Sequence, residues 1–366
     1  MKIIAKRESI LSPLQAVIGV VERRQTMPIL ANVLLSAKGG RLSVTATDLE
    51  VELVATSEVD VQRNGEITIP GRKLLDICRA LPEGAEITLT LDAERMSVRA
   101  RKSRFTLSTL PASEFPTVDE INAQQTLKLP QKDFKHLLEK THFSMAQQDV
   151  RYYLNGLLLE TSAKSLRAVA TDGHRLALCD VDLPDGGKSG QQVIVPRKGV
   201  LELQRILGNE EQMLEVAIGT NHIRVQIGDI RFTSKLIDGR FPEYSRVIPA
   251  TAPRVLTAVR EDLRLALQRA AILSNEKYRG IRFVVKPNLL TIQSHNPEQE
   301  EAEEEVEVSY EGEEIEIGFN VNYLLDALAA VDGPEVQIGL TDGNSSCLIR
   351  SSVESGARFV VMPMRL

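Results

Sequence analysis

The chain has 366 residues, of which 43% are hydrophobic and 26% charged, so it is expected to be an ordinary water-soluble protein with more than one hydrophobic core. The first residues, MKIIAKRESI, turn polar after Ile4, and no apolar run approaches the roughly 20 residues that a membrane span needs. We therefore expect a cytoplasmic location and no membrane partner. Three widely spaced cysteines, Cys78, Cys179 and Cys347, disfavour a disulfide framework or a zinc site and predict small buried side chains.

The net charge of −6 conceals an uneven distribution. Segment 298–316 contains eleven glutamates and neither Lys nor Arg. The remainder of the chain is consequently mildly basic. A pronounced acidic block on a basic body argues against reading the net charge alone as evidence against nucleic-acid binding.

The chain consists of three copies of one unit. Asp48, Asp172 and Asn296 each follow a strand-like run and recur at an interval of 124 residues, and the runs NVLL, GLLL and GIRF keep the same interval. Such self-similarity indicates repeated domains. We predict domains at 1–120, 126–245 and 254–366, the last with a C-terminal tail, joined by polar or Pro-containing linkers at 116–125 and 243–254.

Within each copy, a helix followed by three or four strands occurs twice. In the first copy, Ile10, Leu14, Val17 and Val21 recur at helical spacing, and alternating or apolar runs follow them. The predicted strands of this copy are 29–36, 41–47, 50–59, 85–91, 94–100 and 103–109. The predicted helices of the chain are 9–21, 71–81, 131–141, 196–207, 260–273 and 320–331. This pattern predicts an α+β fold with two helices packed on antiparallel sheets in each domain.

The segment TDGHRL at 171–176 has two interpretations. Asp172 and His174 could serve a phosphate hydrolase, or Asp172 and Gly173 could form a tight turn between strands. The equivalent segments of the other copies, TDLEVE and HNPEQE, lack the His–Arg pair, which favours the turn. GGKS at 186–189 is no phosphate loop, because Asp182 occupies the place of its first glycine, and no metal-ligand spacing or nucleophile motif occurs. An enzyme is disfavoured, and a structural repeat protein without a DNA role stays an alternative.

Positive charge is concentrated in the predicted helices. They contain twelve Lys or Arg and seven acidic residues, although the first and last helices do not share this bias. The segment after the first helix of each copy adds basic residues, amides and tyrosines, as in QQDVRYY. These residue types suit contacts with phosphates that read no base sequence.

Seven blocks of the sequence are typical of one known protein family: QDVRYYLNG, ATDGHRLA, VIVPRKG, ILSNEKYRG, NPEQEEAEE, EIGFNV and the terminal VVMPMRL. In this order, through the second and third repeats, they resemble the bacterial DNA polymerase III beta subunit family, the sliding clamps, and the resemblance extends along all three repeats. The resemblance implies a head-to-tail dimeric ring of six DNA-clamp domains around double-stranded DNA. It also implies a processivity subunit that catalyses nothing, has no cofactor or metal, and recruits partners through short peptides.

The resemblance also implies three sets of functional residues. The DNA-facing residues would be Arg24, Arg72, Lys73, Gln148, Tyr152, Tyr153, Lys198, Tyr278 and Arg282. The dimer interface would contain Arg95, Lys102, Arg104, Ile272, Leu273, Glu300, Glu301, Glu303 and Glu304. The pocket would contain Leu154, Thr171, Gly173, His174, Arg175, Leu176, Pro242, Arg246, Val247, Ser346, Val360, Val361, Met362, Pro363, Met364 and Arg365. This pocket would bind peptides from the DNA polymerase III alpha subunit, the clamp loader, other polymerases and repair proteins.

Overall fold

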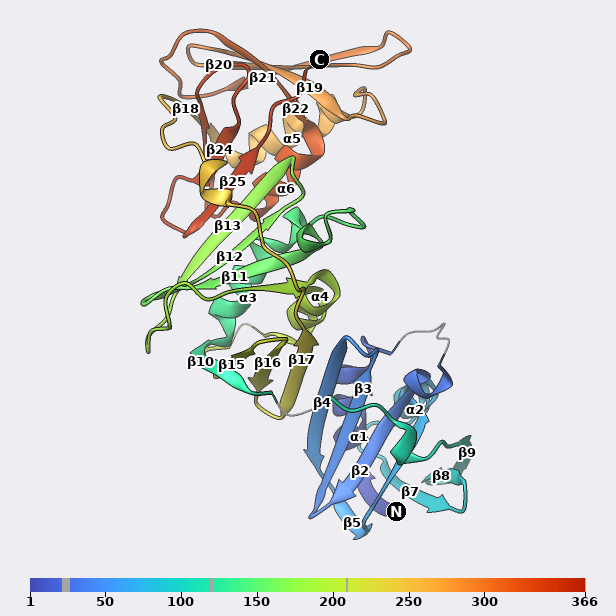
Figure 1. Cartoon of the computed structure of the whole chain (residues 1–366). Coiled ribbons are helices and arrows are strands. Elements are labelled where there is room, and N and C mark those ends of the chain that lie inside the picture. Colours follow the sequence, from blue (N-terminus) through green and yellow to red (C-terminus); the bar gives the residue numbers. More distant parts are fainter. Residues whose placement is uncertain (22–26, 119–120, 209, 366) are drawn as a thin grey trace. The chain divides into compact units, whose positions relative to one another are not determined.

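The computed structural model describes residues 1–21, 27–118, 121–208 and 210–365 (Figure 1). The chain forms two compact units, residues 1–132 with 198–236, and residues 133–197 with 237–366. The central repeat contributes residues to both units. Each unit contains two antiparallel sheets.

Unit 1 contains the first repeat and part of the second. Its five-stranded sheet has the order β5 (Asp60–Arg63), β1 (Lys2–Lys6), β7 (Glu86–Asp92), β8 (Arg95–Ala100) and β9 (Ser103–Ser108). Its eight-stranded sheet has the order β10 (Ala123–Pro130), β15 (Met213–Gly219), β16 (His222–Ile227), β17 (Ile230–Lys235), β4 (Val51–Glu58), β3 (Arg41–Thr47), β2 (Asn32–Lys38) and β6 (Gly65–Pro70). Its helices are α1 (Arg7–Val17), α2 (Gly71–Ala80) and nearly all of α4 (Arg197–Ile206).

Unit 2 contains the rest of the second repeat and the third. Its eight-stranded sheet has the order β14 (Gln192–Pro196), β11 (Gly156–Thr161), β12 (Ser165–Thr171), β13 (Arg175–Asp182), β25 (Ala357–Val361), β24 (Cys347–Ser351), β23 (Glu335–Leu340) and β18 (Arg254–Val259). Its four-stranded sheet has the order β21 (Glu301–Glu307), β20 (Leu289–His295), β19 (Gly280–Lys286) and β22 (Ile315–Asn320). Its helices are most of α3 (Gln131–Glu139), α5 (Arg260–Ala271) and α6 (Val321–Ala330).

Local patterns account for these elements, with differences at their ends. The predicted helix 9–21 begins at Arg7 and ends at Val17, because the N–H groups of Val20 and Val21 then bond to carbonyls three residues back. The predicted strand 29–36 begins only at Asn32, since Pro28–Ala31 forms a 3-10 turn. The short first strand β1 was not predicted, because five residues give little alternation.

The two eight-stranded sheets each cross from one repeat into the next. In unit 1, β4 pairs with β17, where Leu53 lies opposite Phe232. In unit 2, β13 pairs with β25, where Ala177 lies opposite Phe359. These antiparallel pairs join neighbouring repeats by backbone hydrogen bonds, and this continuity is why the central repeat is shared between the two units.

Two expectations from composition can be compared with the structure. All three cysteines are free and buried, as predicted, and burial raises the pKa of each thiol to about 12. Across the described ranges, no helix combines the length and the apolar character that a membrane span requires.

Candidate functional site

The segment TDGHRL forms a tight turn between β12 and β13. Oδ1 of Asp172 accepts hydrogen bonds from the backbone N–H groups of His174 (2.9 Å) and Arg175 (3.0 Å). Gly173 has a φ of +88°, which glycine adopts without a steric penalty. Oδ2 of Asp172 also accepts a hydrogen bond from Nε of Arg175 at 3.1 Å. The carboxylate of Asp172 therefore shapes the turn.

The side-chain oxygen at the equivalent position also bonds to the backbone in the other repeats, at Asp48 in the same way and at Asn296 to the residue four places on. Oδ1 of Asp48 accepts from the N–H groups of Glu50 (2.9 Å) and Val51 (2.7 Å), and Oδ1 of Asn296 accepts from the N–H of Glu300 (2.9 Å). A role that three repeats share is structural, and the hydrolase interpretation of Asp172 and His174 loses its geometric basis. Among the described residues, no group of three or more His, Cys, Asp or Glu side chains could hold a metal ion.

A cavity of about 170 Å³ lies against this turn, within unit 2. Its walls come from the turn after β12, the segment before β18, the end of β25 and the 3-10 turn Tyr152–Leu154. The lining residues are Arg151, Leu154, Thr171, Gly173, Arg175, Leu176, Pro242, Tyr244, Val247, Val360 and Met362. A small, mainly apolar cavity with two guanidinium groups suits an apolar side chain attached to a polar backbone.

Nine residues of the predicted pocket line this cavity: Leu154, Thr171, Gly173, Arg175, Leu176, Pro242, Val247, Val360 and Met362. Seven do not: His174, Arg246, Ser346, Val361, Pro363, Met364 and Arg365. Two lining residues, Arg151 and Tyr244, were absent from the predicted pocket. Arg151 belongs to the QQDVRYY segment that we had linked to phosphate contact. Tyr244 follows the recurrent Phe–Pro pair of the linker, which is the signal that could have identified it.

The residues that miss the cavity have other contacts. The ring of His174 is stacked on Tyr323 with centroids 6.4 Å apart. Arg246 is exposed and pairs with Glu243 at 2.8 Å. The N–H of Met364 donates to the carbonyl of Gly318 at 2.9 Å, so the tail is fastened to β22. These three residues are therefore held by contacts outside the cavity wall.

Ion pairs fix the two arginines at the cavity. Nε and Nη2 of Arg151 donate to the carboxylate of Asp149 at 3.0 and 2.8 Å, and these hydrogen bonds lower the pKa of Asp149 to about 2. Nη1 of Arg175 lies 2.5 Å from Oδ2 of Asp326, and its guanidinium lies 4.6 Å from the ring centroid of Tyr323. The cavity is therefore bordered by side chains already held in place.

The predicted DNA-facing residues differ in exposure. Lys73 is exposed on α2, and Tyr152 and Tyr278 are 57% and 55% exposed. Gln148 is exposed and has a φ of +56°, whereas Tyr153 packs against the core beside the cavity. The remaining members are Arg72, whose Nη2 donates to the carbonyl of Val21 at 2.5 Å, Lys198, which pairs with Asp48, and Arg24, which lies outside the described residues.

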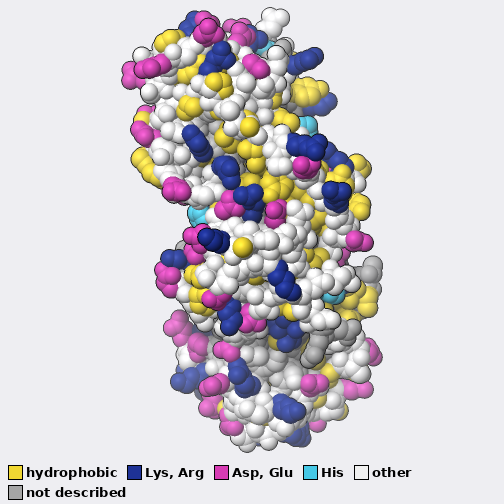
Figure 2. Space-filling view, turned by 60° about the vertical axis from the view of Figure 1, so that its left-hand side comes forward, with side chains coloured by type: hydrophobic (Ala, Val, Ile, Leu, Met, Phe, Trp, Pro, Cys, Tyr) yellow, Lys and Arg dark blue, Asp and Glu magenta, His cyan; other side chains and the backbone are white. Residues whose placement is uncertain are grey.

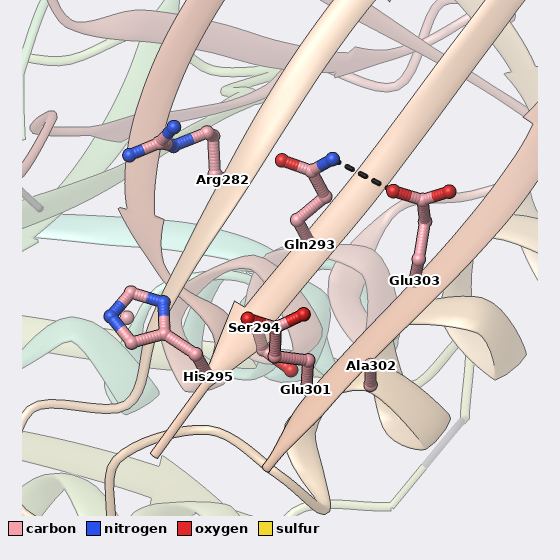
Figure 3. Close-up of a pocket in the computed structure, with 8 residues that line it drawn as sticks. Arg282, Gln293, Ser294, His295, Glu301, Ala302 and Glu303 are labelled. Atoms are coloured by element: carbon pink, nitrogen blue, oxygen red, sulfur yellow. Dashed lines mark hydrogen bonds between the residues drawn. The ribbon is translucent and has the colours of Figure 1, made fainter. Parts of the chain in front are cut away.

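Arg282 lies on a different face from the helices. Ser294 of β20 donates to the carbonyl of Ala270 in α5, so the neighbouring Gln293 points to the opposite face of the sheet. Arg282 is directly opposite Gln293 and pairs with Glu316 at 2.9 Å. Figure 3 shows Gln293 between Arg282 and Glu303, and all three line a pocket of about 550 Å³. The assignment of Arg282 to DNA thus conflicts with helices forming the DNA-facing wall.

Most helix cations are already paired with acidic residues. Seven of the twelve form ion pairs: Lys132–Glu211, Lys135–Glu139, Lys140–Asp332, Lys198–Asp48, Arg205–Glu202, Arg264–Glu261 and Arg269–Glu304. Figure 2 shows Lys and Arg interspersed with Asp and Glu on the face in view. The positive surplus counted from the sequence is therefore partly neutralised within the chain.

Two strands at sheet edges carry charges of opposite sign. Strand β21 is an edge of the four-stranded sheet and exposes Glu301 and Glu303, while Glu304 faces α5 and pairs with Arg269. Strand β9 is an edge of the five-stranded sheet, and its Arg104 lies opposite Arg99 of β8. The other members of the predicted interface are exposed Arg95, Lys102, Glu300 and Ile272, the last 75% exposed, and partly buried Leu273.

Models of the N-terminal, central and C-terminal domains of the DNA polymerase III beta subunit match residues 1–119, 128–243 and 245–365. The chain belongs to the DNA polymerase III beta subunit family. The beta sliding clamp of Pseudomonas putida is 54% identical over 362 residues, which cover 99% of each chain. That of Escherichia coli is 53% identical over 367 residues and covers 100% of each chain. The crystal structure of the DNA polymerase III subunit beta from Pseudomonas aeruginosa matches all of both chains, with a TM-score of 0.97 and 51% identity.

These matches confirm the family resemblance and the α+β fold of three beta-clamp domains. As a DNA polymerase III beta subunit, the chain is a sliding clamp, a replication processivity factor that has no catalytic turnover of its own.

Replacement of Gly173 by Ala is expected to lower the free energy of unfolding by more than the strain of its left-handed backbone alone. The φ of +88° disfavours a residue with Cβ by about 1–2 kcal/mol, and the new Cβ would also lie 3.0 Å from Nη1 of Arg151. Gly190→Ala is a matched control, because Gly190 has a φ of +81° and no atom within 4 Å of the added carbon. The measurement is the free energy of unfolding by denaturant, and equal losses for the two variants would contradict the Arg151 contact.

Proposed function

We propose that this sliding clamp is a ring of two head-to-tail copies that encircles double-stranded DNA, tethers DNA polymerase III and binds partner proteins through peptides in the 170 Å³ cavity. The observation that supports ring formation best is the way in which sheets continue from repeat to repeat. The proposed domains are 1–120, 126–245 and 254–366, as the sequence repeat predicts.

Both junctions within the chain follow one rule. Strand β4 is the third strand after the first helix of its repeat, and it pairs with β17, the last strand of the next repeat. Strand β13 holds the same position in the second repeat and pairs with β25, the last strand of the third. The rule predicts that β21 of the third repeat pairs with a strand equivalent to β17 and β25.

The only strand of that kind left in the described chain is β9, at the edge of the other short sheet. Unpaired edges are sites of strand addition, and here one edge is acidic and the other basic. Pairing β21 of one copy with β9 of another is a heterologous contact, which closes into a ring when the rotation is suitable. Because each copy contains three repeats of one kind, a ring of two copies contains six.

The repeat also predicts the register of this contact. Phe105, Phe232 and Phe359 occupy equivalent places, since they pair with Val98, Val225 and Ile349 on the preceding strands. Because Phe232 faces Leu53 and Phe359 faces Ala177, Phe105 should face the partner subunit's Ala302. Two further pairs follow from this register. Arg104 then lies opposite the partner subunit's Glu303, and Thr106 lies opposite the partner subunit's Glu301.

A disulfide designed in this register should link two copies. Thr106→Cys combined with Glu301→Cys places the thiols on directly opposed positions, within the distance that a disulfide spans. The native cysteines are buried and should not compete. The expected result is a covalent dimer on a non-reducing gel. The control combines Thr106→Cys with Glu305→Cys, which lies four residues out of register, and it should form little covalent dimer. Equal crosslinking of both pairs, or none, would refute the proposed register.

A ring would hold DNA by topology, so its contacts with DNA can be weak and independent of sequence. The proposed contacts are Arg24, Arg72, Lys73, Gln148, Tyr152, Tyr153, Lys198 and Tyr278. Cations, an amide and phenol groups suit phosphate oxygens, and each phosphate contact adds salt dependence without base preference. We omit Arg282 from this set, because it lies on the face of its sheet away from α5.

Loaded onto DNA, the protein should persist on a closed circle and leave a linear molecule by sliding off its ends. The measurement is the fraction of protein that co-elutes with DNA in gel filtration, before and after the circle is cut once. The Thr106→Cys/Glu301→Cys protein, loaded and then oxidised, serves as a control that cannot open. Equal retention on circular and linear DNA would contradict encirclement.

The cavity against the TDGHRL turn is the proposed peptide site. Met362 is 39% exposed and unbranched, and such a side chain adapts its shape to different partners. Leu154, Leu176 and Val360 form an almost fully buried apolar wall. Peptides from the polymerase, the clamp loader and repair proteins are the proposed ligands.

Truncation of the chain after Val361 is expected to weaken peptide binding by about 2 kcal/mol or more, because it removes Met362 from the cavity. The measurement is the Kd of peptides that tile the DNA polymerase III alpha subunit. Val353→Ala, at a residue that is 51% exposed and outside the cavity, is the control and should leave binding unchanged. If the truncated protein binds the peptides with unaltered affinity, the cavity is not the peptide-binding site.

A further inference from the structure

A row of polar side chains crosses the eight-stranded sheet of unit 2 next to the cavity. Gln192, Glu160, Arg167 and Asp180 are direct cross-strand neighbours on β14, β11, β12 and β13. Gln192 donates to Glu160 Oε2 at 2.8 Å, and Arg167 donates to both oxygens of Asp180 at 2.7 and 3.0 Å. Arg358 of β25 adds a contact with Asp180 at 3.4 Å. We call these five residues the polar row.

Tyr244 connects the polar row with the cavity. Its hydroxyl donates to Glu160 Oε2 at 2.9 Å and accepts from Nη1 of Arg167 at 3.2 Å, while the residue lines the cavity and is only 8% exposed. Burial raises the pKa of Tyr244, which keeps the hydroxyl protonated and able to make both hydrogen bonds. Hydrogen bonds with charged groups are stronger than those between neutral groups.

The segment that contains Tyr244 has few other anchors. The N–H of Ile237 donates to the carbonyl of Ile194, and β18 begins at Arg254. Between these residues, the one backbone–backbone hydrogen bond in the described structure is internal, from the N–H of Val247 to the carbonyl of Tyr244. Side chains therefore hold this segment against the sheet, and the hydroxyl of Tyr244 bonds to charged residues of the sheet itself, whereas Arg246 pairs with Glu243 inside the segment.

The polar row is peculiar to the second repeat. The positions of Glu160, Arg167 and Asp180 are occupied in the first repeat by Ser36, Ser43 and Thr56, which pair in the same cross-strand order. In the third repeat they are occupied by Val284, Thr291 and Glu305. Tyr244 is replaced by Val118 after the first Phe–Pro pair. The repeat that supplies most of the cavity lining is thus the repeat with this anchor.

We propose that the polar row fixes the cavity wall through the Tyr244 hydroxyl, so that Arg167 and Glu160 are positioning residues for peptide binding although neither lines the cavity. The proposal rests on the peptide-binding function proposed above. If the cavity wall is already fixed in the free protein, peptide binding does not have to include the entropic cost of ordering that wall. Loss of the hydroxyl, or of its partners, should release the segment and weaken binding.

The test is a double-mutant cycle measured as the Kd of an alpha-subunit peptide. Tyr244→Phe keeps the ring and removes the hydroxyl, and Arg167→Gln removes the guanidinium from the row. Each single change is expected to raise Kd roughly tenfold, which corresponds to about 1.4 kcal/mol. The double variant should bind no more weakly than Tyr244→Phe alone, because that change already removes the hydrogen bond from Arg167. Arg350→Gln is the matched control: Arg350 bonds to Gln337 on the same sheet and does not contact Tyr244.

Three outcomes overturn the proposal. Unchanged affinity of Tyr244→Phe and Arg167→Gln, while truncation after Val361 abolishes binding, would leave the peptide site intact and remove the row from it. Additive losses in the double variant would show that Arg167 does not act through the hydroxyl. Failure of the unaltered protein to bind any peptide would refute the peptide function and this inference with it. Dimer mass and unfolding free energy, measured in parallel, separate loss of the wall from loss of the fold.

Discussion

The structure depends on one interaction, the antiparallel pairing between the third strand after the first helix of a repeat and the last strand of the next repeat. This pairing occurs twice in the chain, between β4 and β17 and between β13 and β25. Each instance converts the sheets of two repeats into one eight-stranded sheet. It leaves the acidic strand β21 and the basic strand β9 with open edges, and the proposed ring of two copies is built on these edges.

The three repeats use one backbone plan with different side chains at equivalent places. Leu176 begins a buried apolar wall beside β25, and its counterpart Glu52 is a buried carboxylate that accepts the N–H of Val118 at 3.1 Å. Burial raises the pKa of Glu52. The third counterpart, Glu301, is exposed on the edge strand. The same position therefore serves a cavity, a fastened linker and an open acidic edge.

Electrostatics in this molecule cannot be read from residue counts. Seven helix cations are engaged by acids of the same chain, so fewer remain free to attract phosphates. A weakly attractive surface suits a protein that must move along DNA, because strong contacts would hold it in place. The turn at Asp172 follows a similar logic: a cluster that looked reactive is bonded to its own backbone.

The sequence by itself determined the threefold repeat, the helices and most strands of the first repeat, because these depend on local periodicity and on a constant interval of 124 residues. It also identified the turn at Asp172 and nine residues of the cavity, since the family resemblance and turn chemistry are local signals. Only the tertiary structure decided which cations are paired, that Arg282 faces away from α5, and that Arg151 and Tyr244 line the cavity. These facts depend on strand register and on partners far away in the chain: Tyr244 meets Glu160 across 84 residues, and no pattern within either segment encodes that distance.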